Sequence, residues 1–251
     1  MSIPRVAHFT THKAKLPDDE QFVVDEFVRL HPNWKVKIWS DEMNERLFRE
    51  HLPDHAEMIL KLPFGVIRAD LARYLYLKSE GGWYLDTDYQ VFKPLDEFSD
   101  CELVLPISWG ADDPTNDYRG IDKVCNSIMG SRAGHPFWDV VIAEAIRRIE
   151  SGPVSINTIE EISGPDLLTQ TRASHLNLVE DSVSPEQRLF HPRITSYPVP
   201  PSEFKDSFGA HWCKGAWRRL DFIGHLLWRI AYIQKRGRVR NWMKSKFPDN
   251  S

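Results

Sequence analysis

The feature that most constrains the fold is a helix that leads through two glycines into a buried strand. Residues 64–79 carry apolar side chains at helical spacing, and Gly81 and Gly82 end the helix. The short apolar run of residues 83–85 then predicts a strand that enters a sheet. The apolar face of the helix is expected to be one stripe made by Ile67, Leu71, Tyr74, Leu75 and Lys78.

Strands and helices alternate along the rest of the chain. Ser40 and Asp41 are suited to cap a helix that begins near residue 42. The 251 residues are enough for one large domain, or one domain with an appendage. The alternation predicts an α/β fold. Further strands are expected over residues 3–9, 34–39 and 103–107, and further helices over residues 18–30, 42–50, 136–150 and 165–172.

Two carboxylates follow the apolar strand of residues 83–85. Asp86 and Asp88 are one residue apart, and in a strand such side chains point to the same side. Carboxylate oxygens are the ligands that Mg²⁺ and Mn²⁺ prefer, and a cation removes the repulsion within the pair. Asp-x-Asp alone is common and also fits a solvated turn. Here the pair lies at the carboxyl end of a strand, where α/β sheets usually bind ligands.

A second charged pair precedes the strand. Asp70 and Arg73 are three residues apart on the expected helix, so they share a face and can point toward one pocket. An ordinary surface ion pair is the alternative, and Arg68 on the same helix fits that alternative better.

The cysteine content and the hydropathy of the N-terminal residues indicate where in the cell the protein is expected. The three cysteines, Cys101, Cys125 and Cys213, are odd in number and widely spaced, so we expect reduced thiols rather than disulfides or a zinc cluster. We expect no signal peptide, because the N-terminal residues form no long apolar run. The expected location is therefore the cytoplasm.

The charge is unevenly distributed. Residues 214–251 hold 10 Lys and Arg against 2 Asp and Glu, a net charge of +8, whereas the whole chain has a net charge of −4. Residues 218–251 are expected to form a basic amphipathic helical segment that lies on the inner, anionic face of a membrane. A helix packed on the domain is the alternative. Nucleic acid is not an expected partner, because the body of the chain is acidic.

Three motifs form a set: RADLAR at residues 68–73, GGWYLDTD at 81–88 and PLD at 94–96. Together they resemble the DXD-containing glycosyltransferases of family 32, which include yeast initiating mannosyltransferases, inositol phosphoceramide mannosyltransferases and bacterial capsule enzymes. Weaker similarity extends over residues 3–217. The resemblance implies a GT-A fold, an α/β nucleotide-sugar-binding fold of Rossmann-like character, for residues 1–217.

The resemblance also implies a reaction: a sugar moves from a UDP- or GDP-sugar to an acceptor hydroxyl, with retention of configuration and with Mn²⁺ or Mg²⁺. The acceptor is expected to be a glycan, a lipid-linked glycan or a glycolipid. The cation ligands implied are Asp86, Asp88 and His211. The catalytic set implied is Asp70, Arg73, Asp86 and Asp88, of which Asp70 and Arg73 hold the donor sugar. Substrate-binding roles are implied for His8, Trp39, Asn126, Gly164 and Trp212.

Two other readings remain. A HAD-type phosphohydrolase also places Asp-x-Asp after an apolar strand, but its pattern requires Thr or Val two residues after the second Asp, where this chain has Gln90. A non-catalytic nucleotide-sugar- or lipid-binding protein with the same fold is the main alternative to an enzyme. Asp166 is the candidate base if the reaction inverts configuration.

Overall fold

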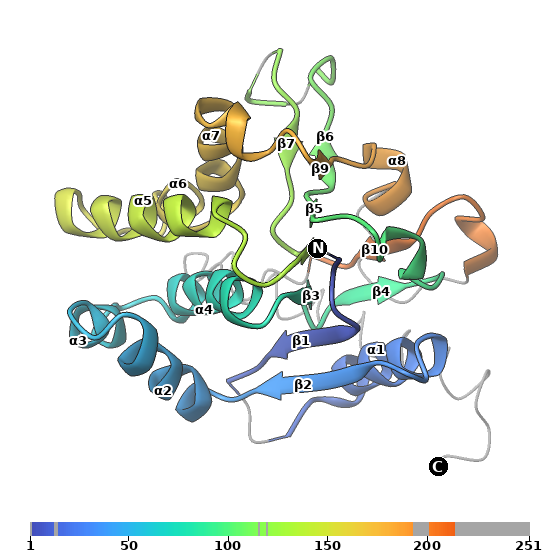
Figure 1. The fold of residues 1–251 in the computed structure, drawn as a ribbon, viewed down its shortest axis with the longest axis horizontal. Coiled ribbons are helices and arrows are strands. Elements are labelled where there is room, and N and C mark those ends of the chain that lie inside the picture. Colours follow the sequence, from blue (N-terminus) through green and yellow to red (C-terminus); the bar gives the residue numbers. More distant parts are fainter. Residues whose placement is uncertain (1, 13–14, 115, 119, 193–200, 214–251) are drawn as a thin grey trace, which may run out of the picture.

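A six-stranded sheet lies at the centre of the computed structural model, which describes residues 2–12, 15–114, 116–118, 120–192 and 201–213. The strand order is β2-β1-β3-β8-β5-β9 (Figure 1). The predicted basic segment 218–251 lies outside the described residues. The strands of this sheet are β1 (Val6–Thr10), β2 (Lys35–Trp39), β3 (Gly82–Leu85), β5 (Leu103–Val104), β8 (Ile128–Ser131) and β9 (Ser182–Val183).

The sheet is mixed, which confirms an α/β fold but not a purely parallel one. Strand β1 pairs in parallel with both β2 and β3, whereas β8 runs antiparallel to its neighbours β3 and β5. Parallel neighbours need a crossover, and α1 (Asp18–Leu30) supplies the one between β1 and β2. The antiparallel pairing brings the beginning of β8 beside the end of β3.

Two short ribbons flank the sheet. Strand β4 (Tyr89–Val91) pairs with β10 (Gly209–His211), and β6 (Ile107–Trp109) pairs with β7 (Lys123–Val124), both antiparallel. The strand predicted over residues 103–107 is therefore two strands, β5 and β6. Pro106 separates them, because proline has no N–H group to continue the ladder.

The helices begin and end close to the predicted residues. The N-terminus of α2 is capped as expected, since the Ser40 hydroxyl accepts from the amide of Met43 at 3.3 Å. Besides α1, the helices are α2 (Asp41–His51), α3 (Ala56–Leu60), α4 (Gly65–Ser79), α5 (Phe137–Ser151), α6 (Ile159–Ile162), α7 (Pro165–Ser174) and α8 (Gln187–Phe190), with 3₁₀ turns η1 (Asp96–Phe98), η2 (Leu176–Leu178) and η3 (Pro201–Glu203).

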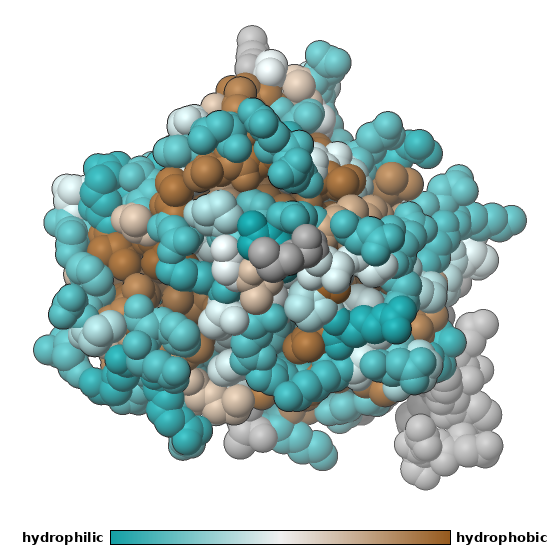
Figure 2. Space-filling view, viewed as in Figure 1, coloured by the Kyte–Doolittle hydropathy of each residue, from teal (hydrophilic) through white to brown (hydrophobic). Residues whose placement is uncertain are grey.

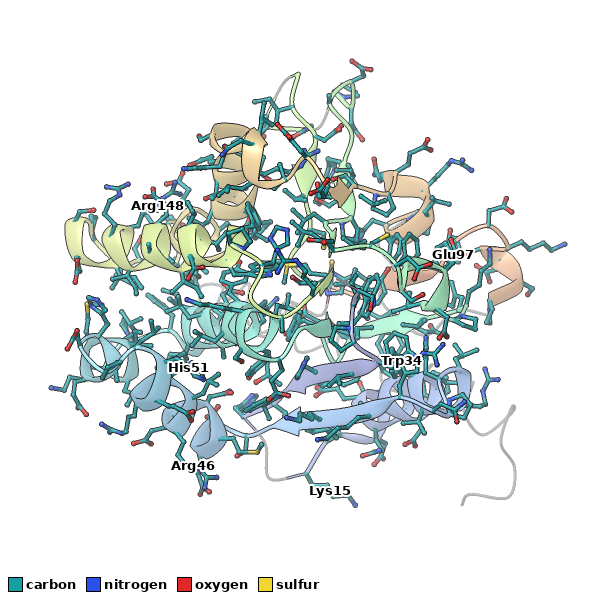
Figure 3. All side chains as sticks on the ribbon, in the orientation of Figure 1. Lys15, Trp34, Arg46, His51, Glu97 and Arg148 are labelled. Carbon is teal, nitrogen blue, oxygen red and sulfur yellow. The ribbon has the colours of Figure 1, made fainter. Side chains whose placement is uncertain are left out.

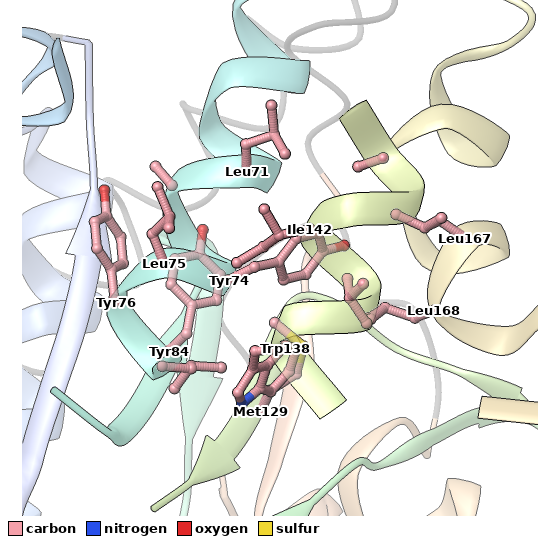
Figure 4. Close-up of a cluster of buried hydrophobic side chains, with 14 of the residues drawn as sticks. Leu71, Tyr74, Leu75, Tyr76, Tyr84, Met129, Trp138, Ile142, Leu167 and Leu168 are labelled. Atoms are coloured by element: carbon pink, nitrogen blue, oxygen red, sulfur yellow. The ribbon is translucent and has the colours of Figure 1, made fainter. Parts of the chain in front are cut away.

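Helix α4 is buried around its whole circumference, so the predicted single apolar stripe is wrong. It packs on α5 and beside the sheet, and Figure 4 shows Tyr74 of α4 beside Trp138 of α5. A helix enclosed on all sides has no need of a polar face, which is why residues outside the stripe are also buried. The buried residues of α4 are Ile67, Asp70, Leu71, Ala72, Arg73, Tyr74, Leu75, Tyr76 and Leu77. Two of them, Asp70 and Arg73, are charged.

The outer helices carry the charged surface. Hydrophilic residues predominate on the face seen in Figure 2, and apolar residues form separate patches between them. Arg148 of α5 donates to the carbonyl of Glu161 at 2.5 Å and to Gln170 at 2.9 Å, which ties α5 to α6 and α7 (Figure 3). No helix in the described ranges is both long enough and apolar enough to cross a membrane.

Gly82 is the glycine on which the start of β3 depends. Its φ is +96°, and a Cβ atom there would lie 2.4 Å from the carbonyl oxygen of Val6 on β1. We expect Gly82→Ala to lower the free energy of unfolding by about 2–4 kcal/mol, because strain and a backbone clash add. Urea titration followed by circular dichroism measures this change. Gly152→Ala is the matched control, since the nearest atom to its Cβ would be 3.6 Å away. Equal midpoints for the two variants would contradict the expectation.

Candidate active site

The two carboxylates of the Asp-x-Asp motif lie in a turn after β3. The amide of Tyr89 donates to the carbonyl of Asp86 at 2.9 Å, so the chain reverses here instead of continuing as a strand. Asp86 is fixed from the other side as well, because its amide donates to the carbonyl of Ser127 at 2.8 Å. The expected clustering of the carboxylates is present, but a turn produces it and not the alternation of a strand.

His211 completes this group through the β4–β10 ribbon. It lies opposite Tyr89 in the register, and the amide of Trp212 donates to the carbonyl of Asp88 at 3.0 Å. The imidazole Nε2 is 3.0 Å from Asp88 Oδ1 and 3.6 Å from Asp86 Oδ2. One ligand atom from each of Asp86, Asp88 and His211 lies within 4.8 Å of the others.

These three residues fit a divalent cation. Two carboxylates supply hard oxygen atoms and a neutral imidazole supplies a nitrogen atom, a set that suits Mn²⁺ and also Mg²⁺. In the protein alone, burial disfavours charge on His211, but the carboxylate of Asp88 outweighs it and raises the pKa of the imidazole well above its ordinary value. Burial raises the pKa of Asp86, and Arg73 is the main opposing influence. A proton on His211 and a cation among the three side chains would therefore compensate the same carboxylate charges.

Arg73 connects the motif to helix α4. Its guanidinium lies 3.1 Å from Asp70 Oδ1 and 3.2 Å from Asp86 Oδ1, and it donates to the carbonyl of Asn126 at 2.6 Å. The same group lies over the ring of Tyr84, 4.4 Å from the ring centroid. The side chains of Arg73 and Asp70 are only 6% and 3% exposed, so the surface ion pair considered from the sequence is excluded.

Asp70 is held by three partners. Besides Arg73, the side-chain amide of Asn126 donates from Nδ2 to its Oδ1 at 3.0 Å, and the hydroxyl of Ser163 donates to its Oδ2 at 2.7 Å. Burial raises the pKa of Asp70 to about 7, while Arg73 and Ser163 favour the carboxylate. The predicted pair is therefore part of a buried network that includes the predicted Asn126.

The sequence reasoning missed Tyr84 and Ser163 as site residues. The Tyr84 hydroxyl donates to Asp86 Oδ1 at 2.6 Å, and Ser163 contacts Asp70 across 93 residues of sequence. The strand period of two places Tyr84 on the side of Asp86 and could have identified it. No local signal relates Ser163 to Asp70.

A large cavity of about 1580 Å³ opens beside this network. Seven of the ten predicted site residues contribute to its wall, although they come from five separate parts of the chain. These seven are Asp70, Arg73, Asp86, Asp88, Asn126, Gly164 and His211. A cavity of this size is large enough for a nucleotide sugar and part of an acceptor.

The other three predicted residues are packed in the core, and the structure does not place them in the cavity wall. Trp39 donates from Nε1 to Nδ1 of His8 at 3.1 Å, and Nε2 of His8 donates to the carbonyl of Gly81 at 2.8 Å. Trp212 is 1% exposed and donates to Gln90 at 3.3 Å. Their bulk and hydrogen bonds hold β1, β2 and β10 in place beside the cavity, because large aromatic side chains pack best where the polar edge finds a partner.

The buried His8 predicts a loss of stability in acid. Burial lowers its pKa to about 4, below the unfolded value of 6.5, so the neutral form stabilises the fold above pH 6.5 and the contribution is lost as the pH falls toward 4. We expect about 2 kcal/mol of this contribution to disappear between pH 7 and pH 5. The groups that influence the ring from neighbouring elements are Lys35, Lys37, Tyr76 and Glu80.

Urea unfolding of the wild type and of His8→Gln at both pH values measures this effect. The variant is expected to be less stable at pH 7 but to lose about 2 kcal/mol less on acidification, because Gln does not titrate. Parallel losses in the two proteins would show that His8 makes no such contribution.

The comparisons with known proteins agree with this geometry. A family model described as the glycosyltransferase sugar-binding region containing a DXD motif matches residues 17–105. This chain contains that region. The matched residues include Asp70, Arg73, Asp86 and Asp88, whereas their partners Asn126, Ser163 and His211 lie outside the match.

Curated relatives match beyond the motif. Inositol phosphoceramide mannosyltransferase 2 of Schizosaccharomyces pombe is 28% identical over 65% of this chain and 44% of its own length. The initiation-specific α-1,6-mannosyltransferase of Candida albicans is 26% identical over 61% of this chain and 46% of its own length. The chain thus spans less than half of these relatives.

Solved structures show the same fold. The PaToxG glycosyltransferase superposes with a TM-score of 0.52 at 15% identity, covering 70% of this chain and 71% of the other. The UDP-bound glycosyltransferase domain of the YGT toxin gives 0.51 at 8% identity, covering 73% and 79%. The expected GT-A fold is confirmed. DXD glycosyltransferases with this fold generally use a divalent metal ion.

Proposed function

We propose that this protein is a metal-dependent glycosyltransferase that moves a sugar from a nucleoside-diphosphate sugar to an acceptor hydroxyl. The observation that carries the proposal is the convergence of two networks on one cavity. Asp86, Asp88 and His211 cluster at one point of its wall, and the buried Arg73–Asp70 pair lies beside them through the 3.2 Å contact of Arg73 with Asp86.

The cation ligands and the Arg73–Asp70–Asn126 group have different roles in this proposal. Asp86, Asp88 and His211 would hold Mn²⁺ or Mg²⁺, which supplies positive charge for the leaving diphosphate. Arg73 offers fixed guanidinium donors toward the same place, held in orientation by Asp70 and the carbonyl of Asn126. Asp70 and Asn126 present acceptor and donor groups to the hydroxyls of the donor sugar. Because these groups are already bonded to one another, they are positioned before the substrate binds.

The donor and acceptor classes draw support from the relatives. One neighbour of the same fold is UDP-bound, and several relatives bear the name of inositol phosphoceramide mannosyltransferases. We propose a UDP- or GDP-sugar as donor and a glycan or glycolipid as acceptor. We also propose retention of configuration, with the leaving phosphate taking the proton of the acceptor.

The test is release of free nucleotide from a panel of UDP- and GDP-sugars, measured with Mn²⁺ and with EDTA. One donor is expected to turn over only in the presence of the metal, and NMR of the product gives its anomeric configuration. Failure of every donor both to turn over and to bind would overturn the proposal. Binding without turnover, also after addition of glycan and lipid acceptors, would favour the non-catalytic binding protein.

We further propose that the protein works in the cytoplasm, on the inner face of a membrane, through the basic segment 218–251. Replacing Arg236, Arg238 and Arg240 by Gln is expected to lower the binding constant of the full chain for anionic vesicles about 10²-fold, as measured by flotation, since each basic residue near the surface contributes about 1 kcal/mol. Raising the salt concentration is expected to weaken binding of the wild type. The control replaces the exposed Arg46, Arg147 and Arg188. Equal flotation of both variants would contradict the proposal.

A further inference from the structure

A second part of the cavity wall is built by the β6–β7 ribbon and the beginning of α7. Trp109 at the end of β6 and Lys123 at the start of β7 both line the cavity, together with Glu160 of α6 and Pro165 of α7. None of these residues belongs to the cation cluster or to the Arg73–Asp70 network. This wall combines a half-buried aromatic ring with charged groups that are paired to one another.

Hydrogen bonds join the described residues of the loop between β6 and β7. The side-chain amide of Asn116 donates to the carbonyls of Gly110 and Ile121, both at 2.9 Å, and its oxygen accepts from the amide of Tyr118 at 3.0 Å. Asn116 is itself 3% exposed. The hydroxyl of Tyr118 accepts from Gln170 of α7 at 2.9 Å. Tyr118 is therefore hydrogen-bonded both within the loop and to α7.

Lys123 is the centre of this wall. Its ammonium lies 2.7 Å from Asp166 and 3.7 Å from Glu160. It also lies 5.7 Å from the ring centroid of Trp109 and 5.6 Å from that of Tyr118, within reach of a cation–π interaction. One cation among two carboxylates leaves this wall with a net negative charge. A phosphate group would be repelled here, whereas neutral hydroxyl groups find both donors and acceptors.

Two segments connect this wall to the donor network. Asn126 and Ser163 each donate a hydrogen bond to one oxygen of Asp70. Lys123 precedes Asn126 by three residues, and Asp166 follows Ser163 by three residues. Lys123 and Asp166 form an ion pair with each other. The Lys123–Asp166 pair and two partners of Asp70 thus lie on the same two stretches of chain, and Asp70, Arg73 and Lys123 line the same cavity. A ligand bound at Lys123 would therefore lie next to a donor sugar bound at Arg73 and Asp70.

We infer that Trp109, Lys123 and Glu160 form the acceptor subsite, and that it takes a neutral polyhydroxylated ring. The ring stacks on Trp109, and its hydroxyls bond the Lys123–Asp166–Glu160 group. The role of this subsite as the acceptor site rests on the proposed function, whereas the binding of the ring does not depend on the proposed function. A pyranose and a cyclitol share this chemistry, and any phosphate on the acceptor lies outside this wall.

The test is saturation-transfer NMR on the full-length protein, with Mg²⁺ and UDP or GDP present to occupy the donor region. The probes are methyl α-mannopyranoside, methyl β-galactopyranoside, myo-inositol, mannose 6-phosphate and an inositol monophosphate. We expect at least one neutral ring to bind, and its phosphorylated counterpart to bind several-fold more weakly. Binding to pyranosides but not myo-inositol, or the reverse, names the source of the ring. Tighter binding of the phosphorylated ring, or binding of none, would overturn the inference.

Variants locate the ring. Trp109→Leu, which keeps apolar bulk, is expected to weaken its affinity about tenfold, whereas Trp109→Tyr keeps it within about twofold. Trp34→Leu, at a half-buried tryptophan that does not line the cavity, is the matched control and leaves the affinity unchanged. A loss with Trp34→Leu and none with Trp109→Leu would overturn the assignment. If Trp109→Leu does not fold, the comparison of neutral and phosphorylated rings on the wild type still decides. Nucleotide binding and release, measured separately, report on the proposed function, so the two can fail independently.

Discussion

Asp88→Asn is expected to lower the turnover of the donor about 10²–10³-fold. The substitution keeps the shape of the side chain but removes a charge from the group formed with Asp86 and His211, whose ligand atoms lie within 4.8 Å of one another. A cation that stabilises the leaving group as a Lewis acid contributes several kcal/mol to the transition state, and 2.7–4 kcal/mol corresponds to about this factor. Nucleotide release at saturating Mn²⁺ measures the loss.

A second measurement separates this effect from misfolding. Electron paramagnetic resonance of free Mn²⁺ is expected to show binding to the wild type that is weakened in Asp88→Asn, with the circular dichroism spectrum unchanged. Asp96→Asn is the matched control, because Asp96 belongs to the same motif set but pairs with Arg5 at 3.0 Å, away from the cavity. Asp88→Asn with turnover within threefold of the wild type, or equal losses in both variants, would refute a role of Asp88 in holding the cation.

Arg73→Met is expected to lower the free energy of unfolding by about 3–5 kcal/mol and to abolish turnover. The substitution leaves Asp70 and Asp86 without the guanidinium that contacts both, and an uncompensated buried charge is costly. Urea unfolding at pH 7 measures the stability, and the nucleotide-release assay measures the turnover.

Two further variants test the reason for this loss. Arg147→Met removes an exposed ion pair with Glu144, at 2.7 Å, and is expected to cost less than about 1 kcal/mol. Adding Asp70→Asn to Arg73→Met is expected to restore part of the stability, because it removes one of the two stranded charges. If Arg73→Met and Arg147→Met unfold at the same urea concentration, the buried network contributes no more to the free energy of unfolding than an exposed ion pair does.

Local signals predicted much of the fold. The bounds of α1 agree with the residues expected from periodicity, and the Ser40 cap of α2 is present, because both depend on contacts within a few residues. The all-round burial of α4 was not predictable in the same way. It arises from α5 and the sheet, whose positions no local pattern of α4 encodes.

The residues of the candidate site could likewise be predicted only in part from local sequence. Local patterns predict that two carboxylates follow a buried strand and that the preceding helix carries an Asp–Arg pair. The contacts that these groups make depend on the tertiary structure. The β4–β10 register carries His211 across 123 residues to Asp88, and the α6–α7 turn brings Ser163 to Asp70. The tertiary structure also pairs Lys123 with Asp166. Local periodicity records which way a side chain points, whereas strand register and helix packing, which depend on the whole core, decide what it meets.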